Sequence, residues 1–182
     1  MKNLKEYIVN ENNFFKNLGI GQEVLIKKWL DKYKITNYTI NKDLTINVYE
    51  VVCIILDKHD EYLPEYIQFN NVDCDFCIAG ENLKSLRGCP KNISYTGGFS
   101  CSGCPELTSL EGCPDNVDWF SCSYCKKLKN LKGAPSYVRG VFDCSECESL
   151  TSLKGCPEYV ENFKCDGCKS LKSLKGCPKK CK

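Results

Sequence analysis

Hydrophobic and polar positions recur with one period through most of this chain. Each segment reads Pro-x-x-Val/Ile, then Phe-x-Cys-x-x-Cys-x-x-Leu-x-x-Leu-x-Gly-Cys-Pro. Phe and the Cys two positions later share one face of a short strand, because side chains alternate along a strand. Gly and Pro permit the tight turn that ends a segment. The repeated prolines lie 24, 21, 22 and 21 residues apart, at Pro90, Pro114, Pro135, Pro157 and Pro178.

This period predicts a solenoid. One segment cannot bury its own apolar face, but stacked segments bury it against one another. We expect about five coils, the earliest of them degenerate and aligned on Val72, Cys74 and Cys77. The strands are predicted to centre on residues 72–74, 99–101, 120–122, 142–144 and 163–165.

Residues 1–62 lack the repeat. Two sets of apolar residues have the spacing of amphipathic helices: Leu4, Tyr7 and Ile8, then Val24, Leu25, Trp29 and Leu30. Residues 38–40 and 44–48 flank a polar turn and predict a β-hairpin. Because repeat proteins cover the apolar end of a terminal coil with atypical elements, we expect an α+β N-terminal cap over 1–62 and the solenoid over 63–182. The alternative is that the N-terminal helices form a separate docking module.

Two octapeptides carry a family resemblance. Residues 107–114 (LTSLEGCP) and 150–157 (LTSLKGCP) resemble the repeats of leucine-rich-repeat-like proteins of tailed phages and other large viruses. They are also similar in pattern to BspA-type leucine-rich repeats. The resemblance implies an α/β repeat solenoid with a short parallel sheet, encoded by a phage or virus. It leaves the function open, because such scaffolds serve many partners.

Cysteine is unusually frequent, with 16 in the chain. Five Cys-x-x-Cys pairs recur in phase with Phe and Leu, so we expect them to be buried, reduced and metal-free core residues. Zinc, which takes four ligands at about 2.3 Å, is an alternative, and disulfides are another. A zinc site would use Cys101, Cys104, Cys122, Cys125, Cys144, Cys147, Cys165 and Cys168.

Composition and charge narrow the class of protein. No apolar run approaches the ~20 residues that span a bilayer, and the first residues lack the apolar segment of a signal peptide. We therefore expect no membrane contact and a cytoplasmic location, in the host cytoplasm if the chain is phage-encoded, with virion association as an alternative. From residue 126 onward, 13 Lys and Arg stand against 6 Asp and Glu. We expect a solvated lysine surface there rather than a nucleic-acid site.

The sequence shows no catalytic constellation. Its single histidine, His59, lies in a polar stretch that reads as an exposed turn. No glycine-rich phosphate loop and no His-Glu-x-x-His motif are present. We therefore expect a protein without enzymatic activity, without catalytic residues and without a cofactor.

Outward strand positions are the best candidates for binding, since they can vary without harming the core. Trp119 and Tyr124 stand out as aromatic residues among small polar ones, a composition typical of recognition patches. We expect a protein-binding module that recognises a host or virion protein through its sheet face. A virion component anchored by N-terminal helices and a zinc-binding regulator are the alternatives, and the oligomeric state is left open. The predicted binding residues are Asp73, Asp75, Ser100, Trp119, Ser121, Tyr124, Asp143, Lys164 and Asp166.

Overall fold

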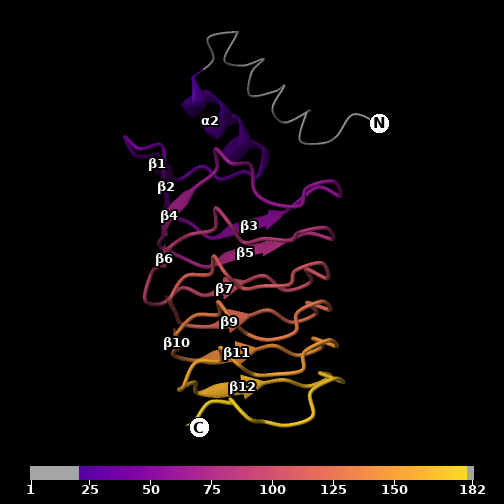
Figure 1. The fold of residues 1–182 in the computed structure, drawn as a ribbon. Coiled ribbons are helices and arrows are strands. Elements are labelled where there is room, and N and C mark those ends of the chain that lie inside the picture. The colour runs from indigo at the N-terminus through magenta and orange to yellow at the C-terminus, as the bar shows by residue number, and fades with distance from the viewer. Residues whose placement is uncertain (1–20, 180–182) are drawn as a thin grey trace.

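The computed structural model describes residues 21–179. They form a parallel β-solenoid of about five turns with little helix (Figure 1). The coils stack along one axis, with the helix α2 (Gln22–Lys32) beside the first of them. The helical segment predicted around Leu4, Tyr7 and Ile8 lies outside the described residues. Within the described residues, no helix has both the length and the apolar character that crossing a membrane requires.

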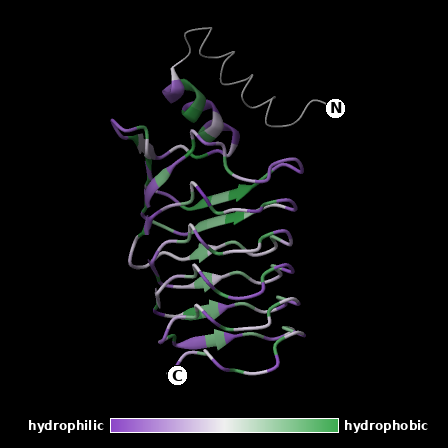
Figure 2. Cartoon of the chain, in the orientation of Figure 1, coloured by the Kyte–Doolittle hydropathy of each residue, from purple (hydrophilic) through white to green (hydrophobic). Residues whose placement is uncertain are grey.

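The strands of the solenoid stack in two columns, of which the first is one continuous sheet and the second is divided into two sheets between β6 and β8. The first column is one six-stranded sheet made of β3 (Val52–Ile55), β5 (Phe76–Ala79), β7 (Phe99–Ser100), β9 (Phe120–Ser121), β11 (Val141–Asp143) and β12 (Asn162–Lys164). The second column holds β2 (Ile46–Val48), β4 (Phe69–Val72), β6 (Asn92–Ile93), β8 (Asn116–Val117) and β10 (Tyr137–Val138), and β1 (Tyr38–Ile40) pairs with β2 at its end. The strands β3 and β5 are largely hydrophobic, whereas β12, in the last coil, is largely hydrophilic (Figure 2).

The core is a stack of aromatic rings with leucines behind it. The ring of Phe99 lies 5.7 Å from that of Phe76 and 6.1 Å from that of Phe120, in near-parallel planes. Phe142 continues the stack at 4.9 Å from Phe120. These side chains are fully buried, and burial of one such side chain stabilises a fold by about 1.5–3 kcal/mol. The leucines predicted to line the return segment are equally buried at Leu107, Leu110, Leu128, Leu131, Leu150 and Leu153.

The cysteine pairs of the middle coils lie in this core. The prediction that they are buried is confirmed for Cys101/Cys104, Cys122/Cys125 and Cys144/Cys147. The second thiol of a pair donates to a carbonyl oxygen of the preceding coil: Cys125 to Cys101 at 3.3 Å, Cys147 to Cys122 at 3.2 Å and Cys168 to Cys144 at 3.1 Å. In each of these three pairs, a weak thiol donor thus links one coil to a carbonyl group of the preceding coil.

The environment favours the protonated form of several of these thiols, whereas a hydrogen bond with Cys122 lowers the pKa of Cys147. Burial raises the pKa of Cys104 to about 12, with the nearby Cys125 adding to the shift. A neutral thiol can donate to a carbonyl oxygen, which a thiolate cannot. Within residues 21–179, no cluster of three or more His, Cys, Asp or Glu has an arrangement that could hold a metal ion. That the thiols are reduced and metal-free in the cell stays a prediction.

The prediction of a strand centred on residues 72–74 is wrong. There β4 ends at Val72, and β5 begins only at Phe76. The reason is packing: Phe76 stacks on Phe99, so Phe76 and not Val72 occupies the aromatic column. Ile78 then takes the inward place that cysteine has in later coils, and Cys77 faces outward.

The N-terminal elements agree in part with the sequence analysis. The hairpin is confirmed, since β1 and β2 pair antiparallel. A helix is confirmed over Gln22–Lys32, and its buried face agrees with the prediction in part. Trp29 and Leu30 are buried as predicted, together with Ile26, whereas Val24 is 43% exposed. The ring of Trp29 meets Phe69 edge-on at 6.1 Å and so continues the aromatic stack. Both strand columns already begin upstream of residue 63, because β2 pairs with β4 and β3 with β5.

Candidate recognition surface

The predicted sheet-face serines lie together on neighbouring strands. Ser100 and Ser121 are in register on β7 and β9. The hydroxyls of Ser102 and Ser121 lie 2.7 Å apart, and Ser123 donates to Ser102 at 3.1 Å. Because these hydroxyls satisfy one another, the centre of the sheet face is a polar surface with little unused hydrogen-bonding capacity.

The same ladder continues toward the last coil. Asp143 is in register with Ser121 on one side and with Lys164 on the other. One carboxylate oxygen of Asp143 accepts the backbone N–H of Ser145 at 2.9 Å, whereas Lys164 and Asp166 are exposed. The structure therefore brings these predicted residues onto one face, and their role in binding stays a prediction.

Asp73 and Asp75 do not belong to this ladder. Their predicted alignment with the serine positions is wrong, because Cys77 occupies the rung beside Ser100. Both aspartates lie in the turn between β4 and β5. The side chain of Asp75 accepts the backbone N–H of Gly98 at 2.7 Å, so it supports the corner of the next coil.

The two predicted aromatic anchors flank opposite ends of β9. Trp119 is partly buried, and its ring packs so closely over Gly98 that a Cβ atom at position 98 would overlap it. Tyr124 is 56% exposed in the turn that follows the strand and has a positive φ of 60°. Trp119 thus has a packing role, while Tyr124 is the freer of the two side chains.

A hollow that the sequence analysis missed lies at the corner between the two strand columns. We call it the tyrosine hollow; its volume is about 430 Å³. Tyr95 and Tyr137 line the hollow, and their side chains are 72% and 40% exposed. Its lining comes from three successive coils, as Ile93, Tyr95, Asn116, Val117, Tyr137 and Arg139.

A charged contact fixes the side chains of the tyrosine hollow. The Nε of Arg139 donates to a carboxylate oxygen of Asp118 at 2.6 Å. The guanidinium group also lies 4.8 Å from the ring centroid of Tyr95, a cation–π distance. The hydrogen bond to Asp118, more than the contact with Tyr95, raises the pKa of Arg139. The hollow is therefore aromatic, locally neutralised in charge and held in place by contacts across coils.

Differences in coil length fall at this corner. Ile93 and Phe99 are six positions apart, whereas Val117 and Phe120 are three apart, so the 24-residue coil carries its extra residues here. They include Tyr95, in a turn closed by a bond from the Gly97 N–H to the Ser94 carbonyl oxygen at 2.9 Å. In repeat proteins, insertions map to loops on one face, which is often the binding face. This length difference is the sequence signal that could have found the hollow.

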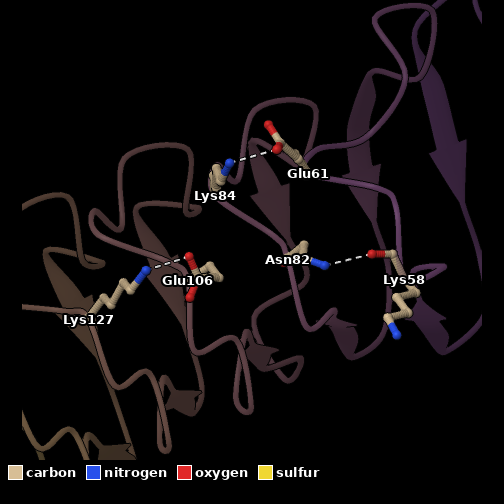
Figure 3. Close-up of polar contacts among 6 residues, drawn as sticks. All are labelled: Lys58, Glu61, Asn82, Lys84, Glu106 and Lys127. Carbon is tan, nitrogen blue, oxygen red and sulfur yellow. Dashed lines mark hydrogen bonds and ion pairs between the residues drawn. The ribbon is translucent and has the colours of Figure 1, made fainter. Parts of the chain in front are cut away.

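Ion pairs between neighbouring coils engage many of the lysines. Lys84 reaches Glu61 and Lys127 reaches Glu106, each at 2.6 Å, beside a bond from Asn82 to the carbonyl oxygen of Lys58 (Figure 3). Such exposed pairs contribute only about 0–1 kcal/mol each. They nevertheless neutralise part of the basic C-terminal half, where the other pairs are Lys132–Glu111, Arg139–Asp118, Lys169–Glu148 and Lys179–Glu158.

His59 is exposed, as its polar surroundings predicted. The absence of enzymatic activity stays a prediction. Comparison with protein-family models, with curated proteins and with solved structures finds no match for this chain.

Proposed function

We propose that this protein is a non-enzymatic binding module that recognises an extended segment of a partner protein at the tyrosine hollow. The observation that carries the proposal is the pair of exposed tyrosines, Tyr95 and Tyr137, around a concave apolar surface. That surface lies where the longest of the regular coils carries its extra residues.

The chemistry of the hollow favours a polypeptide partner. Tyrosine and arginine are enriched among the residues that dominate protein–protein binding energy. Arg139 is already positioned by Asp118 and holds the ring of Tyr95, so little side-chain freedom remains to be lost on binding. An apolar lining between two aromatic rings suits an aliphatic or proline side chain of the bound segment.

The local charge argues against a nucleic acid. Asp118 neutralises Arg139 at the hollow, and cross-coil pairs engage Lys127 and Lys132. Nucleic-acid binding depends on basic groups that replace counterions, and it weakens steeply with salt. Binding in the tyrosine hollow should change little with salt.

The sheet face is a second candidate surface. Tyr124 favours it, because its side chain is exposed beside the ladder of Ser100, Ser121, Asp143 and Lys164. A partner that spans the corner could contact both surfaces, since Trp119 and Asp118 are adjacent in the chain.

We propose that the coils are leucine-rich-repeat-like and that the segment upstream of residue 63 caps the first of them, supported by the contact between Trp29 and Phe69. From the sequence resemblance and the composition, we also propose a phage or viral origin and a cytoplasmic location, with association with virions as the alternative.

Selection from a library of random linear peptides tests the function. On the immobilised protein, we expect enrichment of peptides that share one aliphatic or proline position, because the hollow has an apolar lining. The matched control is selection on the Tyr95→Ala/Tyr137→Ala double variant, on which those peptides should not be enriched. Equal enrichment on both proteins, or none on either, would remove the tyrosine hollow as the recognition site.

A further inference from the structure

Two cysteines lie side by side on the outer face of the six-stranded sheet. Cys53 on β3 is in register with Cys77 on the parallel strand β5. The residues that flank each of them along its strand are buried, so both thiols point away from the core. Neighbouring strands are about 4.8 Å apart, within the Cα separation of roughly 4.4–6.8 Å that a disulfide accepts.

The two thiols already interact. Burial raises the pKa of Cys77 to about 11, and a hydrogen bond and charge repulsion with Cys53 add to the shift. A thiolate at Cys53 therefore opposes ionisation of Cys77. Oxidation removes this conflict, because a disulfide carries no charge.

This pair differs from the cysteines of the core. Cys101, Cys122 and Cys144 are fully buried and stack inward, where no soluble reagent reaches them. On the outer face, the rungs that follow Cys77 along the sheet hold Ser100, Ser121, Asp143 and Lys164. Within residues 21–179, Cys53 and Cys77 are thus the outward-facing thiols on adjacent rungs of this sheet.

We propose that Cys53 and Cys77 are a modification site that forms a reversible disulfide by exchange with a low-molecular-weight disulfide such as glutathione disulfide. The thiolate of Cys53, the more exposed of the two, attacks one sulfur of glutathione disulfide and releases one glutathione thiolate. The thiolate of Cys77 then attacks the Cys53 sulfur of the mixed disulfide and releases the second glutathione. The protein loses two protons and two electrons, and glutathione disulfide becomes two molecules of glutathione.

The position of the pair gives the disulfide a structural consequence. β3 is the last strand at its end of the six-stranded sheet and pairs with β5 alone. The new bond would fasten this terminal strand to the body of the solenoid and enclose β4 in a covalent loop. Opening of β3 would then require reduction.

Peptide mapping of the full chain under non-reducing conditions tests the proposal. After incubation with glutathione disulfide, we expect a peptide that links Cys53 to Cys77, with the loss of two hydrogens, and its disappearance on addition of dithiothreitol. The proposal is overturned if Cys53 instead keeps a glutathione adduct, or if the main product links either residue to Cys74 or Cys177.

Two single variants separate the roles of the thiols. In Cys77→Ser, Cys53 should accumulate the glutathione adduct, because no second thiol resolves it. In Cys53→Ser, the link is absent and Cys77, which is more buried, should react far less. An adduct at Cys53 that is equally persistent in the wild type and in Cys77→Ser contradicts the proposed exchange, and circular dichroism of each variant shows that it is folded.

Discussion

Replacement of Phe120 by alanine is expected to lower the free energy of unfolding by about 3–5 kcal/mol, the usual cost of emptying an aromatic core position. Phe120 is fully buried between the rings of Phe99 and Phe142. The coils on both sides keep their own backbone contacts and cannot close the space that the ring leaves. Urea unfolding followed by circular dichroism measures the change.

Phe163→Ala is the matched control for this prediction. Phe163 occupies the same column in the last described coil, and its ring lies 5.7 Å from that of Phe142 on one side. It is only partly buried, so its removal should cost clearly less. Equal losses for the two variants would mean that the aromatic stack does not stabilise the solenoid from within.

Gly155→Ala is expected to destabilise the protein by about 2–5 kcal/mol, from left-handed backbone strain together with overpacking. Gly155 has a φ of +98° in the turn that ends its coil. A Cβ atom there would overlap the backbone of Leu131 in the preceding coil. Because backbone atoms cannot rotate away, the two coils must separate. Thermal and urea unfolding measure the loss.

Gly176→Ala separates the effect of backbone strain from that of overpacking. Gly176 has a similar φ of +91°, but an added Cβ atom would find its nearest neighbour, a backbone atom of Leu153, at 3.3 Å. The expected loss is therefore only the strain of about 1–2 kcal/mol. If Gly155→Ala cost no more than Gly176→Ala, close packing between the turns of adjacent coils would not be a source of stability.

The regular coils were predictable because one residue type fills each column. Phe99, Phe120, Phe142 and Phe163 all occupy the aromatic column, and the strands that contain them are parallel and in register. The period alone carries this information, since each coil must match the shape of the coil below it.

The coil that contains Cys74 and Cys77 could not be aligned correctly from spacing. Cys74 and Cys77 have the same separation as the later cysteine pairs, which made Val72 look like the aromatic-column residue. What decides the register is the ring of Phe76, which stacks on Phe99. The spacing of the cysteines does not reveal that contact, so the cysteine motif gave the wrong alignment.

The tyrosine hollow was hidden for a related reason. When the repeats are aligned on their phenylalanines, the residues between the two strands of a coil show no repeated pattern and are given no role. Tyr95 is one of these residues, and Tyr137 precedes the valine of the second column. Only the stacking of three coils places these tyrosines around one concave surface with Arg139. The sheet-face ladder, in contrast, follows directly from the alternation of side chains along each strand.

The affinity of one selected peptide for three proteins tests the central claim most directly. Tyr95→Ala removes an anchor of the tyrosine hollow, and Tyr124→Ala removes a comparably exposed tyrosine from the sheet face. An aromatic anchor contributes about 2 kcal/mol or more at an interface. We therefore expect the peptide to bind Tyr95→Ala more weakly than the wild type by about 30-fold or more. Its affinity for Tyr124→Ala should stay close to that for the wild type, and its binding should depend little on salt. Unchanged affinity for Tyr95→Ala together with a large loss in Tyr124→Ala would contradict the proposed function and assign recognition to the sheet face.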